Sequence, residues 1–357
     1  MDVFTDISNL RLAGLTLGAV SLWVSISRLR RAQTSNLAAL MLGSGGAVVF
    51  LTSFFPGAVT VFSDFLTIGQ YPGSRLIALL ILASVTLWMA IAWLSGLAWK
   101  NKLQLDQLIR RIARNEFEQE YRSMRRDDAG CILCIIPALN EADNIGAVLD
   151  RMPKTLAGLP VVSLVVDDGS TDDTADVSRA HGALVVRSPF QRGGGAAIRL
   201  GFDVAELACA RIAVNLDADG QNDPQEMSGL VKPILEDEAD VVIGSRILGS
   251  HEITHWWRHV GVKLFSAIFN ILMSTRITDI SSGYRAIRVE RLKDLRLYQD
   301  QYHTSEFLMM CAKLGLRIRE APIRFARRKS GKSKKGNELL YGFRFARALF
   351  TAWVRAR

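Results

Sequence analysis

Cysteine is scarce in this chain: four cysteines occur among 357 residues, and they are widely scattered. So few cysteines exclude the disulfide framework of a small secreted protein and indicate a reducing compartment. Cys131 and Cys134 have the spacing of half a zinc site or of a redox pair. However, they lie in an apolar run that predicts a buried strand, on which residues three apart point to opposite faces. We therefore expect both to be small core residues.

Charged residues are absent from three long stretches near the start of the chain, residues 12–27, 37–55 and 76–99. Helices over these stretches would be about 24, 28 and 36 Å long, enough to cross a hydrocarbon core of about 30 Å. We predict a transmembrane region of three helices within residues 1–99. The alternative for the first stretch is a signal peptide, but Asp2 lies where a basic region belongs.

Basic residues are absent from the loop between the second and third stretches, residues 56–74. They are frequent between the first two stretches, with Arg28, Arg30 and Arg31, and again from Lys100 onward. Short loops rich in Lys and Arg stay on the cytoplasmic side. We therefore expect the N-terminus outside and everything after the third stretch in the cytoplasm, at the inner membrane.

Lysine and arginine outnumber aspartate and glutamate by 44 to 35. A basic surface can meet nucleic acid or anionic lipid, but the apolar first hundred residues make the membrane the expected partner rather than nucleic acid. Residues 100–128 are predicted to form a cytoplasmic linker helix, with Leu105, Leu108 and Ile112 at helical spacing. This linker and the transmembrane region are candidate contacts of a homo-oligomer.

From Cys131 onward, short apolar runs alternate with helical stretches, which predicts a parallel sheet with crossover helices. The runs are residues 131–136, 164–166, 184–186, 212–216 and 241–243. Ligands of such sheets bind at the carboxyl ends of the strands. Acidic motifs follow three of the runs, at residues 137–141, 167–172 and 217–221.

Carboxylates gathered at one sheet edge repel one another unless a cation lies among them. The Asp-x-Asp pattern at residues 217–219, with an amide oxygen nearby, supplies the hard oxygen ligands that Mg²⁺ and Mn²⁺ prefer. The sequence therefore predicts a metal that clamps a diphosphate.

Six motifs occur in a fixed order, and together they are far more specific than any one of them. They are Pro-Ala-Leu-Asn-Glu at 137–141, Val-Val-Asp-Asp-Gly-Ser-Thr-Asp at 165–172, Arg-Gly-Gly-Gly at 192–195, Asp-Ala-Asp-Gly-Gln at 217–221, Gly-Ser-Arg at 244–246 and Ser-Gly-Tyr-Arg at 282–285. The set resembles the family-two glycosyltransferases of GT-A fold, and more narrowly the dolichyl-phosphate mannose synthase and polyprenyl-phosphate sugar transferase branch. The resemblance implies an α/β, Rossmann-like catalytic domain at residues 129–335. The preceding region resembles a small three-span membrane family that often accompanies glycosyltransferases.

The resemblance implies a donor site at the ends of the predicted strands. The residues that would hold the nucleoside are Pro137, Ala138, Glu141, Val166 and Asp168. Those that would contact the donor phosphate and ribose are Asp217, Ala218 and Asp219. Those that would bind Mg²⁺ or Mn²⁺ are Asp217, Asp219 and Gln221.

The resemblance also implies an acceptor site. Arg246 would lie at the donor and acceptor phosphates, and Arg258 at the phosphate of a polyprenyl lipid. Arg328 and Lys334 would close over the diphosphate from the basic run 327–335, although a solvated loop has the same composition.

The implied reaction moves a hexose from a nucleotide sugar to dolichyl or undecaprenyl phosphate, with inversion, through the catalytic residues Asp219, Arg246 and Arg258. The donor would be of the GDP-mannose or UDP-glucose type, since residues 193–195 resemble both kinds of relative. A phosphate acceptor is already largely ionised at pH 7, so no strong general base is needed. Ser282 and Glu306 would bind the sugar or brace a loop.

Two other functions compete with this reaction. A processive polysaccharide synthase would carry an acidic acceptor-base motif and a glutamine-rich product-binding motif, and neither is evident in the sequence. A non-catalytic membrane scaffold for a lipid-sugar flippase would not need the intact acidic motif at residues 217–221.

Two later segments are amphipathic. Residues 254–275 carry a helical apolar stripe, and residues 336–357 form a basic helix with Phe and Trp on one side. Tryptophan and arginine on one helix favour the membrane interface, with a core-facing helix as the alternative. His251, His255 and His259 are spaced by four, but we do not expect them to bind a metal because the intervening Glu-Ile-Thr is typical of a helix start.

Overall fold

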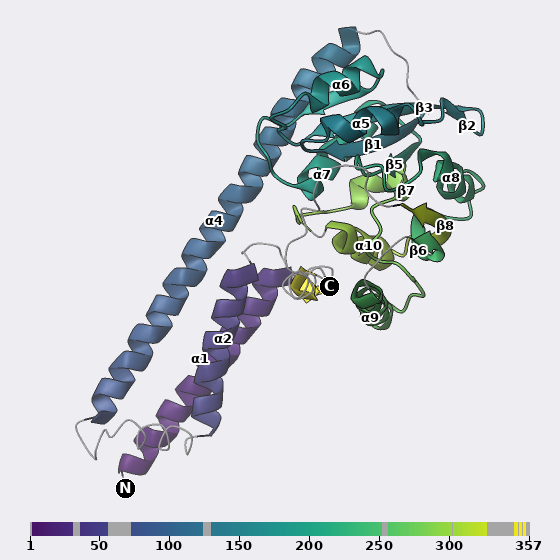
Figure 1. Ribbon diagram of the computed structural model, residues 1–357. Helices are drawn as coiled ribbons and strands as arrows, with labels where there is room; N and C mark the ends of the chain where they lie inside the picture. The colour runs from purple at the N-terminus through teal and green to yellow at the C-terminus, as the bar shows by residue number, and fades with distance from the viewer. Residues whose placement is uncertain are drawn as a thin grey trace. The chain divides into compact units, whose positions relative to one another are not determined.

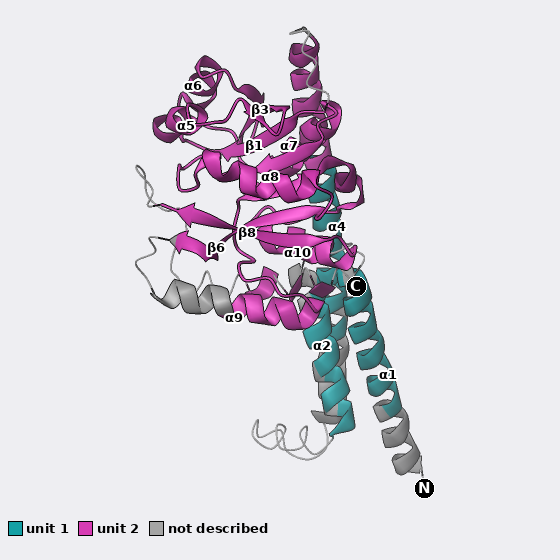
Figure 2. Ribbon diagram, turned by 90° about the vertical axis from the view of Figure 1, so that its right-hand side faces the viewer, with its two compact units in different colours: residues 1–105, 357 teal, residues 106–356 magenta. Residues whose placement is uncertain are grey.

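The computed structural model describes residues 2–30, 36–55, 73–123, 130–251, 256–301, 303–326, 346–348, 350–351 and 353–354. The chain divides into two compact units (Figure 2). The first comprises residues 1–105 with residue 357, and the second comprises residues 106–356.

The first unit contains α1 (Asp2–Arg30), α2 (Asn36–Phe54) and the first part of α4 (Gly73–Ser123). Small residues bring α1 and α2 together: a Cβ atom on Gly18 would lie 2.7 Å from the backbone nitrogen of Phe50. The Ser25 hydroxyl donates a hydrogen bond to the Ala39 carbonyl oxygen at 2.5 Å. Within the described residues, one helical segment is long and apolar enough to cross a membrane, Leu12–Leu29. The second and third predicted spans stay predictions.

Helix α4 continues without a break from Gly73 to Ser123. The predicted third span and the predicted linker are therefore parts of one helix. From Asp106 onward this helix belongs to the second unit.

The buried face of α4 differs from the apolar stripe noted in the sequence. Ile109, Ala113 and Phe117 are buried, whereas Leu108 and Ile112 are exposed. Ala113 and Phe117 belong to the same core cluster as the first strand of the sheet. The end of α4 is thus an integral part of the second unit.

The second unit is built on an eight-stranded sheet (Figure 1). Its strand order is β2-β3-β1-β5-β7-β6-β8, and β4 pairs with β3. The strands are β1 (Ile132–Ala138), β2 (Thr155–Leu156), β3 (Leu159–Asp167), β4 (Leu184–Arg187), β5 (Ile212–Asn215), β6 (Val241–His251), β7 (Arg285–Arg288) and β8 (Ile318–Phe325).

The five predicted strands run parallel, but the complete sheet is mixed because it contains two antiparallel strands that were not predicted. β2 pairs antiparallel with β3, and β7 pairs antiparallel with both β5 and β6, while β1, β3, β4 and β5 are parallel as predicted. Arg285, the first residue of β7, is paired with Ile243 and with Asn215, which ends β5. β7 therefore begins beside the end of β5, because the segment between β6 and β7 does not cross to the opposite edge of the sheet.

Helices cover both faces of the sheet. They are α5 (Ala142–Leu149), α6 (Thr174–Ala180), α7 (Gly194–Leu207), α8 (Met227–Leu235), α9 (Trp256–Met273) and α10 (His303–Lys313), with short 3₁₀ turns η1 (Pro224–Glu226) and η2 (Val289–Asp294). One core cluster joins the sheet to α5, α6 and α8, and the other joins it to α7, α9, α10 and the end of α4. Cys131 and Cys134 are buried in different clusters, which confirms that both are core residues on opposite faces.

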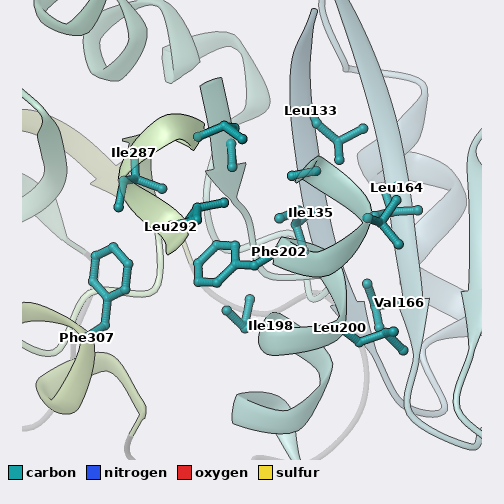
Figure 3. Packing of buried hydrophobic residues seen from close by; sticks show 14 of the residues in the cluster. Leu133, Ile135, Leu164, Val166, Ile198, Leu200, Phe202, Ile287, Leu292 and Phe307 are labelled. Atoms are coloured by element: carbon teal, nitrogen blue, oxygen red, sulfur yellow. The ribbon is translucent and has the colours of Figure 1, made fainter. Parts of the chain in front are cut away.

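Helix α7 lies in the middle of the core cluster that also contains α9, α10 and the end of α4 (Figure 3). Phe202 packs near Phe307 of α10, with ring centroids 6.1 Å apart. Gly201 faces β1 so closely that a Cβ atom on it would lie 2.3 Å from Ile135 Cγ2. Close packing of α7 on the sheet therefore requires glycine at this position.

The described part of the C-terminal segment is helical, as predicted, but one side of it is buried. Trp353 packs against the core cluster of α7 and α10, and the Gln299 side chain donates to the Ala348 carbonyl oxygen at 3.0 Å. Phe350 remains exposed. The Trp353 side of this helix therefore faces the protein, which was the alternative to the predicted membrane interface.

We predict that Gly201→Ala lowers the free energy of unfolding by about 1 to 3 kcal/mol, because the added methyl group overpacks the contact with Ile135. Gly229→Ala in α8 is the matched control, since its nearest neighbour would be Ala321 Cβ at 3.9 Å. That variant should be neutral or more stable by up to about 1 kcal/mol, as expected for glycine to alanine in a helix. Urea unfolding curves of both variants test this, and equal effects would contradict it.

Candidate active site

The ends of β1 and β3 are joined by hydrogen bonds just beyond the sheet. The backbone nitrogen of Asp168 donates to the Ala138 carbonyl oxygen at 2.9 Å. The backbone nitrogen of Asn140 donates to Ser170 Oγ at 3.0 Å, and that of Glu141 donates to Thr174 Oγ1 at 2.9 Å. The two motifs predicted to hold a nucleoside therefore lie side by side.

The predicted nucleoside residues are not equally accessible. Val166 is fully buried in the core beside α7, so its side chain does not reach the sheet edge (Figure 3). Glu141 is also buried, and its carboxylate accepts a hydrogen bond from Asn144 Nδ2 at 2.8 Å. Pro137 is half-buried at the end of β1, while the neighbouring Ala138 is buried.

Asp168 holds the glycine-rich loop of residues 192–195, a role that the sequence analysis missed. Its carboxylate accepts hydrogen bonds from the backbone nitrogens of Arg192 at 2.9 Å and Gly193 at 2.6 Å. Burial raises the pKa of this carboxyl above its ordinary value, although the two bonds act in the opposite direction. Gly169 has φ of 79°, and a Cβ atom on it would lie 2.9 Å from the backbone nitrogen of Gln191. The loop is thereby fixed at the carboxyl end of β3.

The motif at residues 217–221 follows β5 and is held from two sides. A Cβ atom on Gly283 would lie 2.8 Å from Asp217 Oδ2, so the turn before β7 packs directly on this carboxylate. Asp219 Oδ1 accepts from the backbone nitrogen of Gln221 at 3.1 Å. Gln221 in turn exchanges hydrogen bonds with Ala326, just beyond β8.

The donor set of this motif fits a hard divalent cation. Asp217 and Asp219 are half-buried carboxylates, and Gln221 adds an amide oxygen. Gly283 provides space beside Asp217 that any larger residue would fill. In the described part of the chain, no group of three or more His, Cys, Asp or Glu side chains could hold a metal by itself. An ion bound here would therefore need further oxygen ligands, such as those of a phosphate.

Arg246, in β6, is held by an aspartate that the sequence analysis missed. Its Nε lies 2.6 Å from Asp279 Oδ2, and its Nη2 lies 2.7 Å from Asp279 Oδ1 and 2.5 Å from Ser281 Oγ. The guanidinium also stacks over the ring of Phe325, 5.1 Å from its centroid. A bidentate pair of this kind fixes the plane of the guanidinium.

Arg285 organises the turn between Asp279 and β7. Its buried guanidinium donates to the carbonyl oxygens of Ser282 at 2.6 Å, Ile280 at 2.9 Å and Thr304 at 2.5 Å. Burial lowers the pKa of Arg285 to about 10, so it stays charged at neutral pH. The same turn carries Gly283 against Asp217, and Arg285 therefore ties this turn to the start of α10.

Glu306 contacts a loop in the described structure. Its Oε2 accepts hydrogen bonds from the backbone nitrogens of Tyr298 at 3.0 Å and Gln299 at 2.8 Å. Ser282 is buried, and its carbonyl oxygen receives Arg285. The Arg258 side chain, Arg328 and Lys334 lie outside the described residues.

Helix α9 packs on the core with one face and leaves another apolar face exposed. Phe269 is fully buried, whereas Leu264, Ile268 and Ile271 are 56%, 38% and 80% exposed. The exposed residues are part of the apolar stripe noted in the sequence. That stripe therefore does not face the core in the described part of α9.

The model of the family described as glycosyl transferase family 2 matches residues 133–296. Three relatives have similar sequences. A polyprenol monophosphomannose synthase of Mycolicibacterium smegmatis is 32% identical over 57% of this chain and 80% of its own length. An undecaprenyl-phosphate mannosyltransferase of Micrococcus luteus is 32% identical over 57% and 86%. A UDP-N-acetylglucosamine–dolichyl-phosphate N-acetylglucosaminyltransferase of Methanococcus voltae is 31% identical over 54% and 84%.

Among solved structures, glucosyl-3-phosphoglycerate synthase from Mycobacterium tuberculosis with Mn²⁺ and UDP-glucose has a similar fold. The TM-score is 0.51 at 24% identity, over 63% of this chain and 79% of that chain.

We predict that Asp279→Asn lowers the free energy of unfolding by roughly 3 kcal/mol or more at neutral pH, because it leaves the buried charge of Arg246 unbalanced. Burial alone would raise the pKa of Asp279, but the bonds and charge of Arg246 hold it below the ordinary value of 3.8. A depressed pKa gives stability that is complete above the ordinary value and is lost as the pH falls through the folded one.

The difference in stability between the wild type and Asp279→Asn should therefore be constant near neutral pH and shrink only below pH 3.8. Denaturant unfolding across this pH range measures it. Asp176→Asn is the control, because its pair with Arg179 is exposed and worth little. A difference that shrinks already between pH 7 and pH 5 would contradict the assignment.

Proposed function

Because the chain belongs to glycosyl transferase family 2, we propose that it transfers a sugar from a nucleotide donor to a polyprenyl phosphate at a membrane surface. One observation carries the proposal. The turn at residues 279–283 contacts both the Asp217 carboxylate, through Gly283, and the Arg246 guanidinium, through Asp279 and Ser281. The proposed metal-binding carboxylate and the proposed phosphate-binding cation are thereby both contacted by one short segment, which would bring the phosphates of donor and acceptor close together.

Three relatives support a lipid phosphate as the acceptor, since each is named for the transfer of mannose or N-acetylglucosamine to a polyprenyl phosphate. They differ in the sugar. The donor in our proposal is therefore a nucleotide hexose, with GDP-mannose, UDP-glucose and UDP-N-acetylglucosamine as the candidates to compare.

A divalent ion held by Asp217, Asp219 and Gln221 would neutralise the departing nucleoside diphosphate, and the solved structure of similar fold contains both Mn²⁺ and UDP-glucose. Arg246 and Arg258 would bind and orient the acceptor phosphate for attack at the sugar C1 with inversion. The acceptor oxygen is already ionised, so no side chain has to remove a proton. Glu306 is not needed as a base in this scheme. Its carboxylate instead accepts hydrogen bonds from two backbone N–H groups of a loop.

Membrane attachment is part of the proposal. It is supported by the candidate span in α1, by the lipid substrates of the relatives, and by the exposed apolar face of α9. The predicted arrangement remains one of three spans, with the N-terminus outside and the catalytic unit in the cytoplasm.

We predict that the purified full-length protein releases a nucleoside diphosphate only when a polyprenyl phosphate is present. A panel of the three nucleotide sugars with undecaprenyl and dolichyl phosphate in detergent tests this. EDTA should abolish release, and Mg²⁺ or Mn²⁺ should restore it, because the leaving diphosphate needs a counterion. Undiminished release in EDTA would contradict the metal assignment, and release without lipid would contradict the acceptor.

Arg258 gives a separate prediction, because arginine can bind phosphate bidentately where lysine offers a point charge. Arg258→Ala should reduce acceptor-dependent turnover about tenfold or more, as loss of a charged hydrogen bond of roughly 1.5 to 3 kcal/mol implies, with donor affinity near that of the wild type. Arg258→Lys should lose less. Equal loss of donor binding and turnover would place Arg258 at the nucleotide, and no loss would place it at the surface.

A further inference from the structure

Asp106 is the centre of a buried ionic cluster that lies apart from the acidic motifs at the strand ends. It belongs to the part of α4 that packs in the second unit, and it is 8% exposed. Its Oδ1 pairs with Nη2 of Arg192 and lies 2.9 Å from Nη2 of Arg199. Its Oδ2 lies 3.2 Å from Nε of Arg110. One carboxylate of α4 therefore receives three guanidinium groups.

Arg199 connects this carboxylate to a second segment, residues 299–300. Its Nη2 lies 2.5 Å from Asp300 Oδ1, and its Nη1 donates to the Gln299 carbonyl oxygen at 3.0 Å. The Asp300 carbonyl oxygen accepts the backbone N–H of Gly195 at 2.8 Å. The cluster thus reaches both ends of the glycine-rich loop, through the Arg192 side chain and the Gly195 backbone.

The glycine-rich loop has little freedom to move between its supports. Asp168 binds its backbone at residues 192 and 193 from the end of β3. On the other side, a Cβ atom on Gly195 would lie 2.0 Å from the Gln299 carbonyl oxygen. Gly193 has φ of 104°, which only glycine adopts readily. The position of the loop is therefore set by the groups that hold it.

Removing the charge of Asp106 would disturb the loop through Arg192. Burial, and then the neighbouring charge of Arg199, lower the pKa of Arg192, but an arginine side chain is not deprotonated in proteins. The Arg192 side chain is 12% exposed, so its guanidinium without a carboxylate partner is unfavourable there and would turn toward solvent. Because Arg192 is the first residue of the loop, the loop would move with it.

We propose that Asp106 is a positioning residue for the nucleotide-sugar donor, and that it fixes the loop of residues 192–195 from helix α4. The inference rests on the proposed function, which puts the nucleotide at the ends of β1 and β3 beside this loop. Under this proposal, helix α4, which also carries the predicted third span, sets the affinity for the donor.

Asp106→Asn in the full-length protein tests the role, with binding of UDP and GDP measured by calorimetry in the presence of Mn²⁺. We expect the affinity for the bound nucleotide to fall about tenfold, and the donor KM to rise by a similar factor, with a much smaller change in kcat. Asp106→Glu, which keeps the charge, should recover part of the affinity.

Asp203→Asn is the matched control, because Asp203 also joins α4 to α7, through Arg110 at 2.8 Å, without bonding to the loop. It should lower the Tm by a similar amount and leave nucleotide affinity within about twofold of the wild type. Equal weakening by both variants would overturn the positioning role and assign the effect to general packing of α4.

Arg192→Gln provides a second route if Asp106→Asn does not fold. It removes the same contact from the loop side, and it should weaken nucleotide binding by a similar factor. In the double variant the two effects should not add, because they break one interaction. If the wild type binds nucleotide and neither variant weakens it, the positioning role is wrong; if the wild type binds neither UDP nor GDP, the proposed function fails as well.

Discussion

The buried and half-buried carboxylates beneath the candidate site each need hydrogen-bond donors, because a desolvated charge costs several kcal/mol unless it is paired. Asp168 receives two backbone N–H groups, Asp279 receives the Arg246 guanidinium, and Asp300 receives Arg199. Each pairing joins segments that are far apart in the sequence. The loops at the carboxyl edge of the sheet are therefore held by charge pairing and not by apolar packing alone.

The local patterns predicted most of the sheet, and they failed where a strand lacks an apolar run. β1, β3 and β5 were visible because their buried residues are consecutive. β7 was missed because Arg285 and Arg288 form half of it, so its sequence is typical of a loop. The continuity of α4 was missed for a related reason. The charges that begin at Lys100 suggested a break after the span, yet lysine, glutamine and leucine are good helix formers and the helix continues.

The sequence indicated which motifs are candidates for the site, but it indicated few of the contacts between them. Motif order gave Asp217, Asp219 and Arg246 as candidates, but Arg246 lies within β6 and not at its end. No pattern indicates that Asp279, 33 positions away, binds Arg246. Val166 shows the opposite limit, because its place in a motif did not reveal that its side chain is in the core. Pairing across long separations depends on the folded topology, which spacing alone does not encode.

The glycine-rich loop and the Arg246 guanidinium have separate supports in this structure. The glycine-rich loop is held by Asp168, Asp106 and Asp300. Arg246 is held by Asp279. The backbone nitrogen of Asp279 in turn donates to Glu320 of β8 at 3.0 Å. The second set lies on β6, β8 and the turn after α9, and the first lies on α4, the end of β3 and the loop before α10. A change at Asp106 of α4 therefore reaches the glycine-rich loop without passing through the groups that orient Arg246. Under the proposed function, this separation lets donor affinity and acceptor turnover respond to different parts of the fold.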